Sequence, residues 1–452
     1  MTRFFFDVTD IVQYAEANRR VSGIQRVQAR LIGSLARRMG GERIRACFWH
    51  PIQNELVHFD PSAVFDEAEF DTVRFRARLG LLEGFFFPSQ KELRRALAPL
   101  RGKRIRRALR KAEIYVVAVI NRPRFKKMGF SPAWDYRSEP RQELIPIRQM
   151  EATDIYVFLG SNWSHQEVQE FGMRHSESGG SVVQMIYDLI PYLGAEYCIA
   201  SHIVQFESFL TRVTTYANQF ICISEWTKKE LVEFLESRGI NRLVKTVPLA
   251  HEFDGFSRNE TSIQPESKVV AALHGKEFLL CVGTLERRKN GAALLRAWAE
   301  LVKRRERVPL LVFAGKPGWD FGVFNELLEA NPLLQQKVVV ISSPSDRDLA
   351  FMYRASQFSI YPSLYEGWGL PVGEAAWFGK YVIASNATSL PEVCGDLIDY
   401  VDPNDTGDIV AKIEYALDNP DYVARKEKMI RSSKLRTWDE VADSLLNVID
   451  PT

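Results

Sequence analysis

The sequence predicts an α/β protein with two Rossmann-like domains whose sheets are parallel. Two observations carry this prediction. Between residue 277 and about residue 420, short β-branched runs alternate with amphipathic stretches of helix length, and the N-terminal half begins with the same alternation. Because such sheets bind ligands at the carboxyl ends of their strands, functional residues are expected in the loops that follow the strands.

The C-terminal half contains six short apolar runs that predict strands. They cover residues 277–284, 308–315, 337–342, 357–363, 381–385 and 397–401. Helices are predicted between them, near residues 290–304, 320–330, 346–355, 371–379 and 405–418. The pattern predicts a six-stranded Rossmann-like domain over residues 263–430.

The N-terminal half starts with a predicted strand, RFFFDV, followed by a predicted helix in SGIQRVQARLIGSLARRM. Within that helix one apolar face is formed by Ile24, Val27, Leu31 and Leu35. Further strand-like runs cover residues 154–160, 181–191, 220–224 and 244–250. A second Rossmann-like domain is therefore predicted over residues 1–262.

Three segments depart from the alternation. Residues 60–150 are predicted to be a basic helical insertion. Residues 252–275 are polar and rich in turn residues, which is typical of an interdomain linker. Residues 437–449 form one more amphipathic helix after the second sheet is complete, so residues 431–452 are expected to pack back onto the N-terminal domain.

Positive charge is concentrated in residues 91–127, although the formal net charge of the chain is only +2. The segment holds fourteen Lys or Arg residues against Glu92 and Glu113, which makes it +12 and leaves −10 for the rest. Such density predicts contact with phosphates, and we expect an anionic membrane surface rather than nucleic acid. A solvated helical hairpin is the alternative.

The composition argues against several other classes of protein. No apolar run approaches the roughly 18 residues that cross a bilayer, and the start MTRFFFDVTDIV lacks the pattern of a secretory signal. We therefore expect a cytoplasmic protein, peripheral at most to the inner face of the plasma membrane. The five Cys and seven His residues show no metal-binding spacing, so no metal is expected.

The stretch YPSLYEGWGLPVGEAAWFG, at residues 361–379, predicts a strand end, a glycine-containing loop and a helix that starts near Pro371. A helix N-terminus can receive an anion, and carboxylates such as Glu366 and Glu374 suit hydroxyl-rich ligands. The two acids are expected to lie along one elongated ligand. Alternatively, Glu374 only complements the helix dipole and Glu366 is a solvated turn residue.

A cationic loop, LERRKN, follows the first strand of the same predicted sheet. It places Arg287, Arg288 and Lys289 beside a helix start, which is typical of a diphosphate site. The alternative, a solvated loop, fits one or two of them. No GxxxxGK[ST], GxGxxG or GxSxG motif stands in a suitable place, which argues against a P-loop nucleotidase, a dinucleotide-binding domain and an α/β hydrolase.

Several motifs together resemble a known family. EGWGLPVGE is similar to the motif of two glutamates separated by seven residues in the retaining nucleotide-sugar glycosyltransferases of the large family four, which have the GT-B fold. VGTLERRKN, SGIQRVQARL, YDLIPYLGAEYC, ISEWTKKEL, MYRASQF, IASNATSLPEV and YVDPND also resemble that family, in order. The resemblance implies two Rossmann-like domains that face each other across a cleft. Its closest branch is bacterial mannosyltransferase-like enzymes of surface polysaccharide assembly.

The resemblance also implies roles for individual residues. Glu366 would contact the donor sugar, and Glu374 the nucleotide ribose. Lys289, with Arg288 as a weaker candidate, would neutralise the leaving diphosphate, and Gly23 would approach that diphosphate across the cleft. The loop and helix start that would line the donor are Gly367, Trp368, Gly369, Leu370, Pro371 and Val372.

Two positions depart from the family pattern. Thr284 stands where many relatives have an arginine, which gives Lys289 more weight. Tyr187 stands where many relatives have a histidine, and it either hydrogen-bonds a sugar or only packs. Asp188, at a predicted strand end, is the better candidate for positioning the acceptor.

We therefore expect a retaining, metal-independent glycosyltransferase without a cofactor. It would move a hexose, mannose from GDP-mannose, to a lipid-linked or polysaccharide acceptor in bacterial surface polysaccharide synthesis. The alternatives are a UDP- or dTDP-sugar donor, a nucleotide-sugar epimerase, and a phosphate- or membrane-binding protein with a vestigial site.

Overall fold

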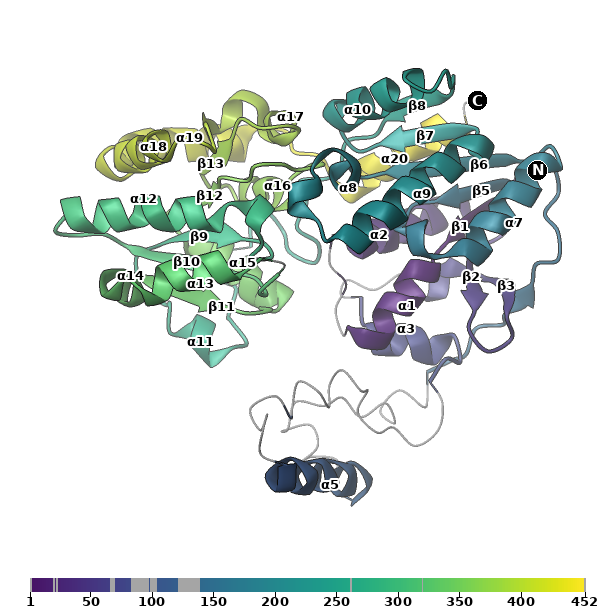
Figure 1. The fold of residues 1–452 in the computed structure, drawn as a ribbon, viewed down its shortest axis with the longest axis horizontal. Helices are drawn as coiled ribbons and strands as arrows, with labels where there is room; N and C mark the ends of the chain where they lie inside the picture. The colour runs from purple at the N-terminus through teal and green to yellow at the C-terminus, as the bar shows by residue number, and fades with distance from the viewer. Residues whose placement is uncertain are drawn as a thin grey trace. The chain divides into compact units, whose positions relative to one another are not determined.

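The computed structural model describes residues 2–18, 21, 23–65, 70–82, 97, 104–120, 139–260, 262–318 and 320–450. The chain divides into two compact units, Met1–Val183 and Gln184–Thr452, and the boundary falls within strand β6 (Ser181–Ile186). Strands and helices alternate through the second unit, and less regularly through the first (Figure 1). The domain boundaries predicted at residues 262 and 430 stay predictions.

The strands of the first unit form the part of a sheet in which parallel and antiparallel pairs both occur. β1 (Phe4–Asp7) pairs in parallel with β2 (Ile44–His50) and β5 (Ile155–Phe158). β3 (Glu55–Phe59) runs antiparallel to β2, and β4 (Ile145–Pro146) runs antiparallel to β3. Residues 51–54 are too few for a parallel crossover, which needs a dozen or more residues, so this edge departs from an all-parallel sheet.

The helices of the first unit are α1 (Thr9–Ala17), α2 (Ile24–Met39), α3 (Thr72–Arg78), α5 (Arg104–Ile120) and α7 (Gln166–Glu177). The predicted apolar face of α2 is confirmed, because Val27, Leu31 and Leu35 are buried and Ile24 is half-buried. Of the basic segment 91–127, Leu97 and α5 are described, and the rest lies outside the described residues.

Two sheets organise the strands. The first has the order β4-β3-β2-β1-β5-β6-β7-β8, with β7 at Gln219–Cys222 and β8 at Leu243–Thr246. The second has the order β11-β10-β9-β12-β13-β14, and its pairs are parallel. Its strands are β9 (Phe278–Val282), β10 (Leu310–Ala314), β11 (Val338–Ile341), β12 (Ser359–Tyr361), β13 (Val382–Ser385) and β14 (Asp399–Val401). All six strands predicted for the C-terminal half are confirmed.

The helices of the second unit include the five predicted for the C-terminal half. In chain order they are α8 (Ile190–Leu193), α9 (Ala200–Tyr216), α10 (Glu225–Glu236), α11 (Lys268–Ala271), α12 (Gly291–Arg304), α13 (Gly322–Glu329), α14 (Pro332–Lys337), α15 (Asp346–Ala355), α16 (Leu370–Trp377), α17 (Leu390–Cys394), α18 (Thr406–Asp418), α19 (Pro420–Ser432) and α20 (Trp438–Ile449). The helices that were not predicted are α8, α9, α10, α11, α14, α17 and α19. Gln219 of β7 donates a hydrogen bond to the Val448 carbonyl of α20 at 3.2 Å, so the last helix lies against that strand.

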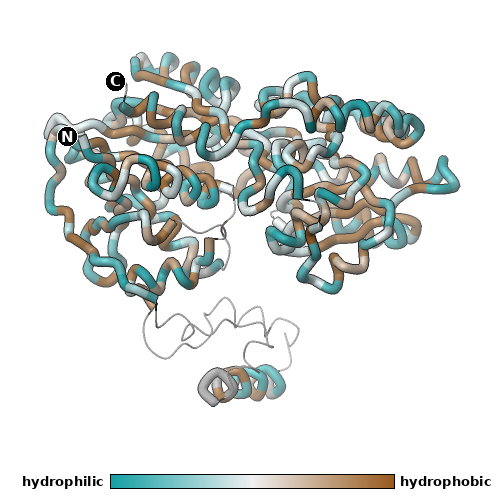
Figure 2. The backbone as a smooth tube through the Cα atoms, turned by 180° about the vertical axis from the view of Figure 1, so that it is seen from behind, coloured by the Kyte–Doolittle hydropathy of each residue, from teal (hydrophilic) through white to brown (hydrophobic). Residues whose placement is uncertain are grey.

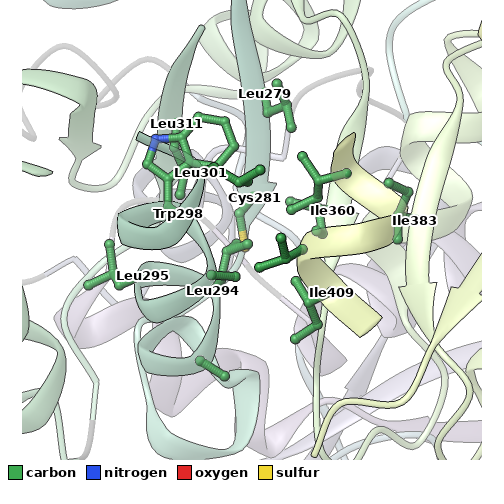
Figure 3. Close-up of a cluster of buried hydrophobic side chains, with 14 of the residues drawn as sticks. Leu279, Cys281, Leu294, Leu295, Trp298, Leu301, Leu311, Ile360, Ile383 and Ile409 are labelled. Carbon is green, nitrogen blue, oxygen red and sulfur yellow. The ribbon is translucent and has the colours of Figure 1, made fainter. Parts of the chain in front are cut away.

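The core of the second sheet lies beneath α12 and α18. Trp298 and Leu294 of α12 point toward Leu279 and Cys281 of β9, and Ile409 of α18 joins them (Figure 3). All of these side chains are buried. The core fixes β9 and its neighbours, so the loops at their carboxyl ends start from rigid positions.

Candidate active site

The stretch that carries the two glutamates forms a strand, a loop and a helix, as predicted. β12 ends at Tyr361, and α16 begins at Leu370 with Pro371 in its first turn. Gly369 precedes the helix with a φ of +115°, a conformation that strongly favours glycine. As the N-cap residue, Gly369 supplies no side-chain hydrogen bond to the first amides of the helix.

The carboxylate of Glu366 lies between two cations. Lys289 Nζ donates to Oε1 at 2.5 Å, and Arg288 Nη1 donates to Oε2 at 2.7 Å. Glu366 is only 7% exposed. The structure therefore brings together the two sequence motifs that were predicted to share one sheet edge.

Arg288 is bonded in several directions at once. Its Nη1 also donates to the Tyr365 carbonyl at 2.8 Å, and its Nη2 donates to Glu286 Oε1 at 2.7 Å. Its own carbonyl accepts from the Leu364 amide at 2.8 Å. Arg288 thus ties the loop after β9 to the loop after β12, which is more than the weak diphosphate role that the sequence suggested.

The electrostatic balance at this site keeps Glu366 ionised. Burial alone would raise the pKa of Glu366, but Lys289 and Arg288 outweigh it and lower that pKa to about 2. Burial likewise works to lower the pKa of Arg288, and the carboxylates of Glu366, Glu286 and Asp188 raise it above its ordinary value. The Glu366 carboxylate is therefore ionised at neutral pH.

The backbone of Glu366 is held by two residues that were not predicted. The Thr388 hydroxyl accepts from the Glu366 amide and donates to its carbonyl, both at 3.0 Å. Ser389 Oγ donates to the same carbonyl at 2.8 Å and contacts the Trp368 carbonyl at 3.2 Å. Both residues come from IASNATSLPEV, which contributed to the family resemblance without a role for any residue in it.

Glu374 lies one turn inside α16 and is buried. The hydroxyl of Tyr353, on α15, donates to Glu374 Oε2 at 2.8 Å. That bond orients the carboxylate at the helix start. The role at a ribose that the resemblance implied for Glu374 stays a prediction.

The acceptor candidates lie against the same loop. A Cβ added to Gly367 would stand 2.1 Å from the Tyr187 carbonyl oxygen and 3.0 Å from Asp188 Cβ, so only glycine permits this approach. Burial, and to a lesser extent Glu366, raises the pKa of Asp188, while Arg288 and Lys289 oppose the rise. Gly23 belongs to the first unit, where it precedes α2 with a φ of +53°, and its role stays a prediction.

The remaining donor candidates lie where the motif placed them. Trp368 and Val372 are buried, and Leu370 and Pro371 are half-buried. A cavity of about 380 Å³ lies at the carboxyl ends of β9 and β10, and its lining includes Gly283, Thr284, Lys289, Asn290, Phe321 and Phe324. This volume is within the range of small-molecule sites. Within the described part of the chain, no three His, Cys, Asp or Glu side chains gather as a metal site would require.

Comparisons with known proteins define the class. The structure of Anabaena Alr3699/HepE in complex with UDP and glucose matches over 100% of both chains, with a TM-score of 0.58 and 15% sequence identity. At that identity the likeness shows the fold alone, and the fold is the GT-B fold of glycosyltransferases, as predicted.

The sequence comparisons identify the family. Residues 262–436 match the family described as glycosyl transferases group 1. O-antigen chain mannosyltransferase B of Escherichia coli is 30% identical over 268 residues, which are 59% of this chain and 69% of that protein. The E. coli serotype-specific mannosyltransferase WbdA is 27% identical over 295 residues, which are 64% of this chain and 36% of WbdA. The chain belongs to the glycosyl transferases group 1 family.

Unfolding at different pH values tests the buried charge cluster. Because the folded-state pKa of Glu366 is about 2, below its ordinary 4.5, ionised Glu366 adds stability that is present above pH 4.5 and is lost as the pH falls toward 2. We expect Glu366→Gln to lower the free energy of unfolding at neutral pH by about 3 kcal/mol, which appears as a lower urea midpoint. The difference from the wild type should shrink as the pH falls.

The exposed Glu326→Gln serves as the matched control and should leave the midpoint unchanged at every pH. A deficit of Glu366→Gln that stays constant between neutral and acid pH would contradict the depressed pKa.

Proposed function

We propose that this protein is a retaining mannosyltransferase that transfers mannose from GDP-mannose to a lipid-linked or polysaccharide acceptor in bacterial surface polysaccharide synthesis. The observation that carries the proposal is the buried, ionised Glu366 between Arg288 and Lys289, beside the N-terminus of α16. The similarity to O-antigen chain mannosyltransferase B and to mannosyltransferase WbdA supports the choice of mannose, and the first of these names also supports a polysaccharide acceptor. The guanosine base rests on the family resemblance.

The cations and the helix start would stabilise the leaving group. Departure of a nucleoside diphosphate builds negative charge on its phosphate, and fixed positive groups stabilise that charge in a water-poor site. The Lys289 ammonium has three donors, of which Glu366 takes one, so others can serve phosphate oxygens. The amides around Pro371 and Val372, at the N-terminus of α16, would add further donors.

Glu366 would serve the sugar. An ionised carboxylate accepts hydrogen bonds from sugar hydroxyls and stabilises positive charge that develops on an oxocarbenium-like ring. Asp188, which lies against the Glu366 loop, would position the acceptor hydroxyl. We propose front-face attack with the donor phosphate as base and no required metal, in contrast to the two-carboxylate mechanism of retaining glycosidases.

Three alternatives remain distinct in their products. A UDP- or dTDP-sugar donor would give transfer with another nucleotide. A nucleotide-sugar epimerase would change the sugar without an acceptor. A binding protein with a vestigial site would neither release a nucleotide nor transfer a sugar.

Turnover of a panel of nucleotide sugars tests the proposal. With an O-antigen-type mannan acceptor, we expect GDP-mannose to give nucleotide release and transfer, with the anomeric configuration retained by NMR and the rate unchanged by EDTA. Glu366→Gln and Lys289→Met should each lower the rate by roughly 10²–10³-fold, because each removes charge aimed at the transition state.

Exposed residues of the same types provide the controls, namely Glu326→Gln and Lys303→Met, and these should retain wild-type rates. Full activity in Glu366→Gln, or an epimerised sugar without transfer, would overturn the assignment.

We also propose that the enzyme works at an anionic membrane surface through α5. On this helix Leu109 and Val116 are seven residues apart, which places them on one face, and they are 66% and 54% exposed. Arg106, Arg107 and Lys111 are exposed on the remaining surface. Figure 2 shows hydrophobic and hydrophilic residues alternating along α5. A basic amphipathic helix of this kind lies in the membrane interface.

No helix in the described part of the chain is long and apolar enough to cross a membrane. A surface-bound helix would instead bring the enzyme to a lipid-linked acceptor, which is held at the bilayer. Peripheral binding at the inner face of the plasma membrane is therefore part of the proposal.

Sedimentation with vesicles tests this part. The full chain should pellet with vesicles that contain phosphatidylglycerol and less with pure phosphatidylcholine, since the attraction is partly electrostatic. The double variant Leu109→Glu/Val116→Glu should lose most of this binding. The control double variant Leu333→Glu/Val269→Glu adds the same charges at exposed positions outside α5, and its vesicle binding should fall less than that of Leu109→Glu/Val116→Glu. Equal pelleting of both double variants would refute the membrane role. So would a parallel binding assay in which the full chain binds RNA and fails to pellet with the vesicles.

A further inference from the structure

We propose that Glu230 of α10 is a positioning residue for the reaction at Glu366, which it serves by holding Tyr365. This inference rests on the proposed function, since it concerns the loop that presents Glu366 to the donor. Glu230 lies within ISEWTKKEL, one of the motifs that resemble the family, but the resemblance gave this residue no role. Its hydrogen bond with Tyr365 connects it to the loop that carries Glu366.

Tyr365 precedes Glu366 directly and is held at both ends. Its hydroxyl donates to Glu230 Oε1, and its carbonyl accepts from Arg288 Nη1 at 2.8 Å. The side chain and the backbone of one residue are therefore fixed by two different elements. Rotation of Tyr365 would move the Glu366 carboxylate relative to its cations.

The carboxylate of Glu230 is itself oriented. Trp226 Nε1 donates to Glu230 Oε1 at 2.6 Å, so this oxygen receives two hydrogen bonds. Oε2 is buried, and no hydrogen bond reaches it from the described residues. Burial raises the pKa of Glu230, and Asp188 adds to the rise. Glu230 as a whole is half-buried, and an unpaired buried oxygen costs free energy, so the hydrogen bonds that hold this side chain in place are those at Oε1.

Helix α10 is anchored next to the site from two sides. The Glu392 carboxylate of α17 accepts from the Glu225 and Trp226 amides at 2.7 and 2.8 Å. Thr227 Oγ1 donates to the Tyr187 carbonyl at 3.3 Å, the carbonyl against which Gly367 packs. Since α17 follows directly after Ser389, one rigid frame holds Glu366 through its own carbonyl and through Tyr365.

The frame predicts which kinetic quantity depends on Glu230. Misplacing the Glu366 carboxylate would slow the chemical step, because a shift of about 1 Å at a reacting centre can cost up to roughly 10²-fold in rate. The groups proposed for the diphosphate, Lys289 and the α16 start, would stay in place. We therefore expect a loss in kcat with little change in the affinity for GDP.

A double-mutant cycle tests the proposal. Tyr365→Phe and Glu230→Ala should each lower kcat about tenfold, and the double variant should lose no more than either alone, because one hydrogen bond is removed in each case. Glu230→Gln keeps an oxygen that accepts from Tyr365, so its kcat should stay within about threefold of the wild type. GDP affinity, measured by calorimetry, should be unchanged in all four variants.

Glu233→Ala, one turn further along α10 and exposed, is the matched control and should behave as the wild type. Unchanged kcat in Tyr365→Phe, or losses that multiply in the double variant, would overturn the role of Glu230 while leaving the proposed function intact. Absence of sugar transfer by the wild-type protein would instead overturn the proposed function itself.

Discussion

The ion cluster of Glu366, Arg288 and Lys289 is the interaction on which the rest of the site depends. Removing three charges from water is expensive, and mutual attraction offsets that cost only when the geometry is good and the remaining donors find partners. Arg288 meets this condition through Glu286 and the Tyr365 carbonyl. Removal of Glu366 would leave two largely buried cations without this carboxylate between them. The hydrogen bonds of Thr388 and Ser389 to the Glu366 backbone keep the carboxylate in that place.

The sheet order makes the cluster possible. Lys289 and Glu366 are 77 positions apart, yet β9 and β12 are hydrogen-bonded neighbours in the second sheet. Parallel neighbours end at the same edge, so the loops that follow them meet there. The core formed by α12, α18 and these strands fixes that edge, and Thr388 and Ser389, which follow β13, close the site from the other side.

Much of this could be predicted from the sequence, and particular residues show where prediction stops. Runs such as FLLCV and the EGWGLPVGE motif identify strands, a loop and a helix start, because they depend on local patterns. The sequence could not predict that Arg288 links two loops, because the three hydrogen-bond partners of its guanidinium come from the loop after β9 and the loop after β12. Glu230 and Ser389 were missed because each acts through tertiary contacts with the Glu366 loop, which no local pattern encodes. Strands β2, β3 and β4 were missed as well: β4 has two residues and lies inside the predicted insertion, and β2 and β3 follow each other without the helix that the βα alternation requires.

A crystal structure with bound GDP-mannose would show whether the ion cluster holds the donor. We expect the diphosphate within hydrogen-bond reach of Lys289 Nζ and of the amides at the start of α16, with the sugar against the Glu366 carboxylate. Arg288 should keep its bonds to Glu366 and to the Tyr365 carbonyl. A donor bound elsewhere, with the Glu366 cluster unchanged and remote from it, would show that the cluster has no part in donor binding.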